Sequence, residues 1–386
     1  MVFLQLQSSR LAPGRKAFRQ FLRTTNAVNQ AKTGLSQKSA WTVSMEATKM
    51  PKIDIKTSAP MRALATAKTK YPDFFKAVDR IYKDPDAKWD KSICYCPVGL
   101  GVTYAVDIAG LDSPTLAERG EIIRTGATLA ILASWRKAKS IYVLDKDLEE
   151  ELFKTSAKDM TVAPGMLTIP EWCVYVETSL LQGCSGLFIM FDHDIQRGRK
   201  ELYISPVTPD GKVLTSFYLI LPKQPQRLTE ILKGEEADFR AKDISNAPAL
   251  APYVSNYFKV SRHAVRFTIN LLLYLSAINT EVRQVNKLSF RRQGWIKDTP
   301  REVAVYSVGE ATGYRIRRIN RYVREHGEPQ GGHHRSPVMH VRRAHWHTFA
   351  YGPGKSLRRV KWLPPIIVNG DGEEIDIPTV TELSDK

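Results

Sequence analysis

The sequence predicts an α+β protein in which helical segments pack on a mainly antiparallel sheet, with a basic, β-rich module at the C-terminal end. Apolar residues recur at helical spacing over much of residues 61–153, whereas short β-like runs dominate residues 172–221. Beyond Glu281 the composition changes to Arg, Gly and His with further short β-like runs. We therefore expect four regions, which are a flexible basic arm (1–60), an α+β body (61–285), a basic His/Arg/Trp-rich β module (286–370) and an acidic tail (371–386).

The predicted arm has no acidic residue before Glu46 and is rich in Ser, Thr, Gln, Lys and Arg. Its only apolar pattern covers residues 11–22. Three interpretations stay open, namely a merely solvated extension, a segment that contacts nucleic acid, and a targeting peptide of the mitochondrial type, which is also Arg-rich and poor in acids.

Helical patterns define the first part of the predicted body. Apolar spacing predicts two short helices over residues 61–81 with a break at Pro72, because proline disrupts a helix interior. A long helix is expected over 116–139 and a shorter one over 145–153. Ahead of the long helix, residues 93–106 have a β-like pattern, so we expect a strand there.

The second part of the predicted body is a sheet. Residues 172–177 are rich in aromatic and β-branched residues and are apolar on both faces, so they should form a central strand. Residues 228–232 begin a surface helix, and residues 265–278 form a helix that is buried on most sides. The strands expected between them as an antiparallel meander are 186–191, 201–205 and 216–221.

The charge of the chain is unevenly distributed around a formal net charge of +17. Residues 1–70 carry a net charge of +11 and residues 311–361 a net charge of +10, whereas residues 71–310 carry only +1 and residues 362–386 carry −5. Two basic segments therefore flank a nearly neutral body. Because clustered cations attract polyanions through counterion release, the sequence predicts RNA or the ribosome as a partner.

Composition and cysteine usage exclude several classes of protein. Hydrophobic residues make up 43% and charged residues 25%, which excludes a chain that is disordered throughout. The longest apolar stretch, within 267–278, is well short of the roughly 20 residues that span a bilayer, so no membrane partner is expected. No apolar signal sequence precedes the cysteines, which suits a reducing cytosol without disulfides. They are Cys94, Cys96, Cys173 and Cys184.

Three weaker signals predict neither a metal nor a cofactor. Cys94 and Cys96 would share one strand face, but a second pair with metal-like spacing is missing from the sequence. Residues 99–101 (Gly-Leu-Gly) lack the third glycine of a dinucleotide fingerprint. Residues 192–194 (Asp-His-Asp) could hold a cation, yet they lie where a hairpin turn is needed.

Six of the eight histidines lie between His326 and His347, within the predicted basic module. His345 and His347 are two residues apart and so share one face of a strand, with Arg343 in the same parity. Such a pair could cleave a phosphodiester, one imidazole removing the 2′-hydroxyl proton and the other protonating the leaving oxygen. A binding surface, a hydrogen-bonded core and a zinc site are the alternatives, so catalytic residues stay unassigned and His345 and His347 are only candidates.

Basic residues alternate with aromatic residues twice in this module, whose β-like runs also include residues 303–308. Aromatic faces stack on bases while guanidinium groups hold phosphates, so the pattern favours contact with RNA. The same groups could instead stack on one another and build the module. The candidate RNA-binding residues are Arg342, Arg343, Trp346, Arg358, Arg359, Lys361 and Trp362.

Several segments resemble a known family. The most specific are the stretches HVRRAHWH at 340–347 and RVKWLP at 359–364, with further matches near Trp135 and over residues 167–176. With these segments the chain resembles the type V-A anti-CRISPR family, whose members block biosynthesis of the type V effector nuclease. The resemblance covers roughly residues 61–370 and leaves the arm and the acidic tail outside it.

The resemblance implies recognition of the N-terminal polypeptide of the effector nuclease as it emerges during translation, followed by destruction of its message. Such a protein needs a cleft for an extended peptide and a means of engaging RNA or the ribosome. The neutral body could supply an aromatic-lined peptide groove. Its candidate peptide-binding residues are Trp135, Trp172 and Tyr175.

We therefore expect an anti-CRISPR-like protein of mobile-element origin that acts in the cytoplasm of a bacterial host and is not itself an enzyme. One alternative is a histidine-dependent ribonuclease. Another is a plasmid or phage RNA-binding protein without anti-CRISPR activity. The sequence does not determine the oligomeric state.

Overall fold

The computed structural model shows one compact unit from Thr57 onward. The first 53 residues, which make up most of the predicted arm, and the predicted acidic tail lie outside the described residues. The residues that the structure describes are 54–112, 114–239, 251–286, 302–326, 340–352, 354 and 357–368.

A seven-stranded mixed sheet forms the centre of the unit, in the order β6-β5-β4-β3-β1-β9-β8. β1 runs parallel to both β3 and β9, and every other neighbouring pair is antiparallel. The α+β class and the mainly antiparallel sheet are therefore confirmed. The strands are β1 (Ser140–Leu144), β3 (Cys173–Glu177), β4 (Gly186–Asp194), β5 (Arg199–Val207), β6 (Phe217–Ile220), β8 (Val282–Gln284) and β9 (Ala304–Val308).

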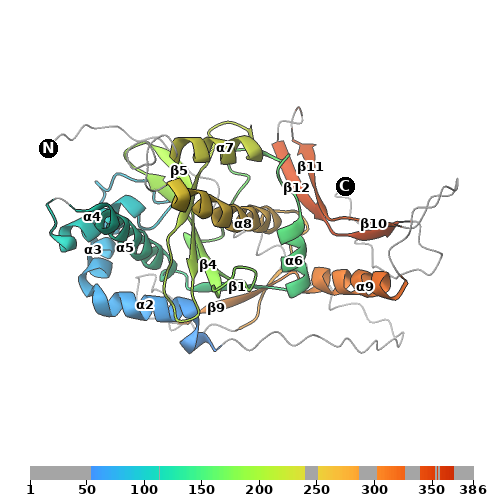
Figure 1. The fold of residues 1–386 in the computed structure, drawn as a ribbon, viewed down its shortest axis with the longest axis horizontal. Helices are drawn as coiled ribbons and strands as arrows, with labels where there is room; N and C mark the ends of the chain where they lie inside the picture. The colour runs from blue at the N-terminus through green and yellow to red at the C-terminus, as the bar shows by residue number, and fades with distance from the viewer. Residues whose placement is uncertain are drawn as a thin grey trace. The chain divides into compact units, whose positions relative to one another are not determined.

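Helices cover both faces of this sheet (Figure 1). Trp135, at the end of α5, packs on Phe188 of β4, and the neighbouring residues Leu187 and Ile189 join the cluster around α8 on the opposite face. A short two-stranded sheet pairs β2 (Thr161–Val162) with β7 (Gln226–Arg227). The helices are α2 (Ala59–Lys70), α3 (Pro72–Lys83), α4 (Val98–Ala109), α5 (Leu116–Trp135), α6 (Lys146–Lys154), α7 (Leu228–Phe239), α8 (Ala251–Leu275) and α9 (Glu310–His326), after a 3-10 turn at Ile55–Thr57.

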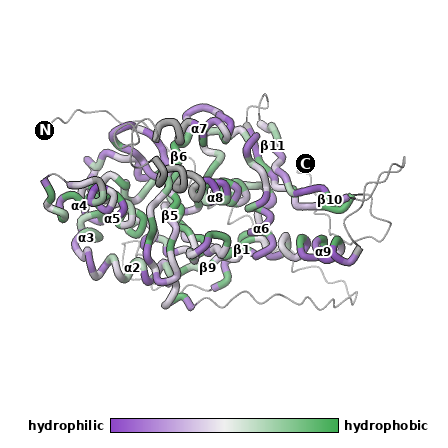
Figure 2. Tube along the Cα trace, viewed as in Figure 1, coloured by the Kyte–Doolittle hydropathy of each residue, from purple (hydrophilic) through white to green (hydrophobic). Residues whose placement is uncertain are grey.

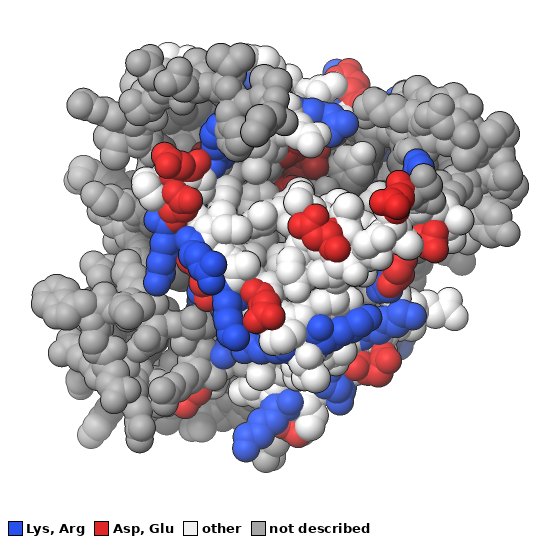
Figure 3. All heavy atoms as spheres, turned by 90° about the vertical axis from the view of Figure 1, so that its left-hand side faces the viewer, with Lys and Arg blue, Asp and Glu red and all other residues white. Residues whose placement is uncertain are grey.

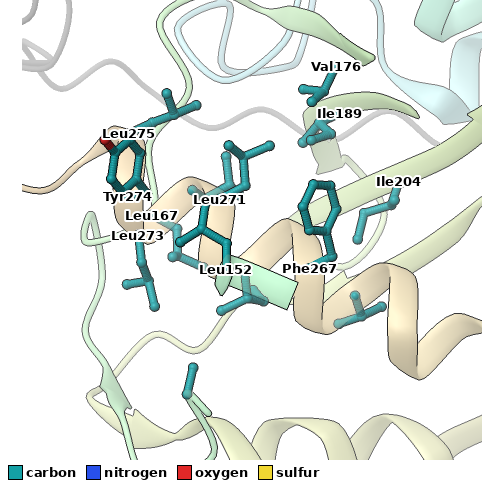
Figure 4. Packing of buried hydrophobic residues seen from close by; sticks show 14 of the residues in the cluster. Leu152, Leu167, Val176, Ile189, Ile204, Phe267, Leu271, Leu273, Tyr274 and Leu275 are labelled. Carbon is teal, nitrogen blue, oxygen red and sulfur yellow. The ribbon is translucent and has the colours of Figure 1, made fainter. Parts of the chain in front are cut away.

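The C-terminal half of α8 is the spine of the main hydrophobic cluster (Figure 4). Phe267, Leu271 and Leu272 are each at most 1% exposed, so they are enclosed on every side. Burying a side chain of this size stabilises the fold by about 1.5–3 kcal/mol relative to leaving it in water. Phe267 and Leu271 lie between the sheet residues Val176 and Ile189 and the end of α6, so α8 joins the sheet to α6.

Most elements predicted from local patterns are present. The two short helices meet at Pro72, the long helix begins at Leu116 behind a capping box of Thr115 and Glu118, and α6 begins behind Asp145. β3 lies in the middle of the sheet, and the buried helix predicted near 265–278 is the second half of α8.

The strand expected at 93–106 is wrong, because this segment contains α4. Val and Gly residues gave the segment a β-like composition, but tertiary packing decides its conformation. Gly101 of α4 lies directly against the backbone of Gly126 in α5, so the two glycines allow the helices to approach closely. Cys94 and Cys96 precede the helix in a turn and share no strand face, although both are fully buried.

Some residues predicted to belong to a separate basic module lie in the body or pack against it. β9, predicted there as the run 303–308, pairs in parallel with β1 inside the main sheet. Val360 and Trp362, near the C-terminal end of the described residues, belong to the same hydrophobic cluster as α8. The described C-terminal residues thus pack onto the body, and the boundaries at 286 and 371 stay a prediction.

We expect Gly101→Ala to lower the midpoint of thermal unfolding, because the added methyl group would overlap with the Gly126 carbonyl oxygen. Overpacking of this kind costs about 1–3 kcal/mol. Gly120→Ala is the matched control, since Gly120 lies in α5 with open space around its Cα and alanine favours a helix by about 0.5–1 kcal/mol. Equal midpoints for the two variants would contradict the close α4–α5 contact.

Candidate functional site

An aromatic cluster surrounds Trp172, just before β3. Tyr82 and Tyr95 stack with 4.3 Å between ring centroids, and the Trp172 ring lies 5.3 Å from Tyr95 and 5.8 Å from Tyr82. The indole N–H of Trp172 donates to the carbonyl oxygen of Lys91 at 2.9 Å, which fixes the orientation of the ring. Trp172 and Tyr82 are only half-buried, so the cluster presents part of its aromatic surface to the outside.

A charged group of residues stands beside the cluster. Asp79 accepts hydrogen bonds from the hydroxyl of Tyr95 and the guanidinium of Arg136, and it pairs with Lys137 Nζ at 2.8 Å. Burial would raise the pKa of Asp79, but the hydrogen bonds from Arg136, Lys137 and Tyr95 outweigh it and lower this pKa to about 2. Figure 3, which views the side of the molecule with the N-terminal helices, shows Lys and Arg side chains forming a broken band across this side.

A hollow of about 300 Å³ is linked to the cluster through the loop at residues 90–93. Ile93 lines the hollow, and the backbone N–H of Asp90 donates at 2.9 Å to Nδ1 of His193, which also lines it. The other lining groups are apolar or basic. They include Val162, Leu167, Leu221, Pro222, Arg199, Lys200 and Lys223.

The basic residues of the hollow differ in whether nearby carboxylates balance their charge. Arg199 donates from Nε to Glu201 at 2.7 Å and lies 3.6 Å from Asp194, so its charge is balanced locally. Burial lowers the pKa of Lys200, whose Nζ lies 3.7 Å from the centroid of the Phe191 ring. The hollow therefore combines apolar walls with lysine, which suits an extended polypeptide carrying apolar and acidic side chains.

Two of the three residues predicted for the peptide groove are core residues. Trp135 is fully buried and donates its indole N–H to the Ser140 carbonyl oxygen at 2.9 Å. Tyr175 is 2% exposed, and both rings pack on Phe188, at 5.5 and 5.2 Å between centroids. Neither side chain has surface to offer a ligand, because the sheet and α5 enclose them. Of the predicted set, Trp172 alone is accessible.

A bent ribbon forms the second candidate surface. β10 (His340–Arg342) pairs with β13 (Ile366–Val368), and β11 (His345–Tyr351) pairs with β12 (Leu357–Leu363), both antiparallel. Between the two pairings, residues 343–344 face Pro364 and Pro365. Proline has no N–H to donate to a ladder, so the ribbon bends there.

The inner face of the ribbon is anchored to the core. Trp346 Nε1 donates to Asn270 Oδ1 at 2.8 Å, while Asn270 Nδ2 donates to the carbonyl oxygens of Leu152 at 2.9 Å and Thr155 at 2.8 Å. Trp362 is fully buried, and its Nε1 donates to Thr155 Oγ1 at 3.3 Å. Both tryptophans, predicted to contact RNA, are therefore anchors, because alternate residues of a strand point to opposite faces.

The outer face of the ribbon, which we define as His345, His347, Phe349, Tyr351, Arg359 and Lys361, follows from the register. His347 lies opposite Lys361, and Phe349 lies opposite Arg359. The rings of His347 and Phe349 meet edge to face at 4.2 Å. His347, Phe349 and Arg359 are exposed. This face therefore sets rings on β11 opposite cations on β12, whereas the sequence predicted cations and rings alternating along each strand, with Trp346 and Trp362 as the rings.

The remaining predicted cations are also exposed. Arg342 lies at the end of β10, and Arg343 lies in the bend. Arg358 lies toward the tip of the ribbon, at a position that alternates with the outer-face residue Arg359. Among the described residues, no ion pair joins Arg342, Arg343 or Arg359 to a carboxylate.

His345 is held in one tautomer by its neighbours. Its Nδ1 lies 3.1 Å from the carbonyl oxygen of Arg343, which can only accept, and its Nε2 lies 3.2 Å from Nη2 of Arg342, which can only donate. The proton is therefore on Nδ1, and both ring nitrogens are engaged. The histidine pair shares the outer face as predicted by spacing, but His345 has no free nitrogen for proton transfer.

The structure adds a basic helix that the sequence analysis missed. In α9, Ile316 and Ile319 are buried, whereas Arg318, Arg321 and Arg324 are exposed at a spacing of three. Figure 2 shows the corresponding alternation of apolar and hydrophilic residues along α9. The signal was the helical spacing of these isoleucines and arginines, which the expectation of a β-rich module obscured.

No group of three or more His, Cys, Asp or Glu side chains that could hold a metal ion is found within the described residues. The four cysteines are free. Among the described helices, none combines the length and apolarity needed to cross a bilayer.

Comparisons with known proteins agree on one relationship. A family model described as "AcrVA2-like: Anti-CRISPR type V subtype A2 family" matches residues 142–370. Among solved structures, the crystal structure of AcrVA2 is similar at 19% sequence identity and a TM-score of 0.53, covering 81% of this chain and 99% of the other. At that identity the likeness shows the fold alone. No curated protein matches the chain.

We expect Asp79→Asn to destabilise the protein at pH 7 by about 1 kcal/mol, since a carboxylate that is 36% exposed is partly screened by solvent. The folded-state pKa of Asp79 is below its unfolded value, so this stability is present above about pH 4 and lost as the pH falls toward 2. Unfolding curves at pH 2–7 should therefore converge for the wild type and the variant at low pH. The exposed Asp73, changed to Asn, is the control, and parallel curves for Asp79→Asn would refute the assignment.

Asn270→Ala should lower the unfolding free energy by about 3 kcal/mol, because it leaves two buried carbonyl groups and the Trp346 indole without partners. Amide hydrogen exchange should accelerate in β11 and β12. Asn320→Ala, on the exposed side of α9, should change stability by less than about 0.5 kcal/mol. Unchanged exchange in the ribbon would show that Asn270 does not anchor it.

Proposed function

The chain belongs to the AcrVA2-like family of type V subtype A2 anti-CRISPR proteins, and from this premise we propose that it recognises the nascent N-terminal polypeptide of a type V-A CRISPR effector nuclease and triggers loss of the encoding message. In this proposal the chain is of phage or plasmid origin and acts in the cytoplasm of a bacterial host. It is a recognition protein and does not itself cut the message.

The observation that carries the proposal is the hollow linked to the Trp172 cluster. Apolar side chains such as Leu167 and Leu221 can hold apolar side chains of an extended peptide, while Lys200 and Lys223 favour acidic ones. Trp172 and Tyr82, whose rings meet edge to face, add aromatic surface beyond the loop at residues 90–93. A hollow of about 300 Å³ has room for a few side chains, which suits recognition of a short peptide segment.

A nascent peptide is presented only beside the ribosome, so the protein also needs contact with RNA or the ribosome. The exposed cations of the ribbon support this part of the proposal. They are Arg342, Arg343, Arg358 and Arg359, with the half-buried Lys361 beside them. Clustered cations attract a polyanion and lose affinity steeply as salt rises.

The ribonuclease alternative has less support from the geometry. A general acid and a general base each need a ring nitrogen within reach of the substrate, and both nitrogens of His345 are engaged by Arg342 and Arg343. His347 is exposed but packs edge to face on Phe349. These contacts favour binding over proton transfer.

The test measures effector protein and effector transcript together, in bacteria translating a type V-A effector with and without this chain. Both levels should fall when the chain is present. A transcript that stays constant while activity is lost would overturn the proposal in favour of inhibition of the finished enzyme. Cutting of the naked message by the purified chain, abolished by a double His345→Ala and His347→Ala change, would instead establish the ribonuclease.

Ala163→Trp should abolish the fall in effector protein and the fall in effector transcript. Ala163 lines the hollow, and the larger tryptophan ring would fill it. Ala163→Ser is the matched control and should leave effector silencing intact, since it adds a single oxygen atom. Pull-down of the effector's N-terminal peptide by the two variants should show the same contrast. Silencing by Ala163→Trp at the wild-type level would exclude the hollow as the peptide site.

A further inference from the structure

We propose that the outer face of the ribbon binds single-stranded RNA, with bases stacked on its rings and phosphates held by its cations. The inference deepens the proposed function, on which it rests for its RNA partner. It specifies that the RNA is single-stranded, and it names a binding surface whose main rings were not among the RNA-binding residues predicted from the sequence. Those rings are Phe349 and Tyr351, together with the imidazole of His347.

The rings and cations of this face are spaced for stacking. Phe349 is 39% exposed, a large value for an aromatic ring on a strand that packs against the core on its other face. The ring centroid of His347, two residues earlier in β11, lies 4.2 Å from that of Phe349. Arg359, opposite Phe349, lies 4.2 Å from the centroid of the Tyr351 ring. A base on Phe349 would therefore have a guanidinium within reach of its phosphate.

The local charge of the ribbon favours an anionic ligand. No acidic residue occurs between Glu328 and Asp371, so every charged residue of the ribbon is basic. In the part of the chain that the structure describes, Arg359 forms its stacking contact with Tyr351 and no ion pair with a carboxylate. A guanidinium in this state can bind a phosphate without first giving up an acidic partner.

The surface is also held in place before any ligand arrives. Trp346 and Trp362, on the inner face, are bound to Asn270 and Thr155, and the backbone N–H of Ile278 donates to the Val360 carbonyl oxygen at 3.1 Å. The strands are therefore fixed to α8 and α6. Little conformational entropy is lost when a ligand binds such a surface, which increases its affinity.

Single-stranded RNA fits this surface better than a duplex. Exposed rings gain from stacking only when the bases are free, whereas duplex bases are already stacked on one another. A ribbon whose charge alone mattered would bind duplex and single strand through the phosphates alike. The aromatic rings therefore decide the class of partner.

The test is fluorescence anisotropy of the purified full chain with a labelled 12-nucleotide RNA of mixed sequence, single-stranded or annealed to its complement. The single strand should bind more tightly than the duplex. Phe349→Ala should weaken binding of the single strand about tenfold or more, and Phe349→Trp should preserve it. Ile366→Ala is the matched control, because Ile366 has the same 39% exposure on the same ribbon and lacks a ring.

Arg359→Ala should weaken binding and reduce the dependence of affinity on salt, since one phosphate contact is lost. Equal affinity of Phe349→Ala and the wild type, or tighter binding of the duplex, would overturn the inference. Loss of effector-peptide binding in Phe349→Ala with RNA binding unchanged would also overturn it and make the surface a protein contact. The anisotropy assay contains neither effector nor ribosome. Its outcome is therefore independent of whether the chain silences the effector in cells.

Discussion

The side-chain amide of Asn270 is the interaction on which the arrangement of the C-terminal residues depends. It is 1% exposed in the C-terminal half of α8, and it bonds two carbonyl groups at the end of α6 as well as the indole of Trp346. A buried amide without partners would cost several kcal/mol, so the ribbon must lie where Trp346 can reach it. One buried amide in the C-terminal half of α8 thus fixes where a distant β ribbon docks.

Docking of one face decides the role of every side chain on the ribbon. Trp346, Val360 and Trp362 point inward and become part of the core, so residues of the opposite parity must point outward. The outer face as defined above is basic and aromatic and contains no acid. The anchored and the exposed set alternate along the same two strands, so a shift of register by one residue would exchange them.

Local patterns predicted much of the fold, including the pair of helices around Pro72, α5, α6 and the central position of β3. They failed where distant contacts decide, as in α4, whose Gly101 is explained only by Gly126 in another helix. For the candidate site, spacing correctly placed His345 and His347 on one face. It could not show which face is covered, because Asn270, which binds Trp346 on the covered face, lies 76 residues before Trp346 in the chain. The same limit applies to Trp135 and Tyr175.

The two candidate surfaces share one rigid core, and this bears on how they can act together. Val162 and Leu167 line the hollow and belong to the same hydrophobic cluster as Val360 and Trp362 beneath the ribbon. Closely packed interiors resist small deformations, so a peptide in the hollow and RNA on the outer face would be held at a fixed separation. Under the proposed function, coupling between them needs no conformational change, because a chain bound to a nascent peptide would also hold its outer face close to the message being translated.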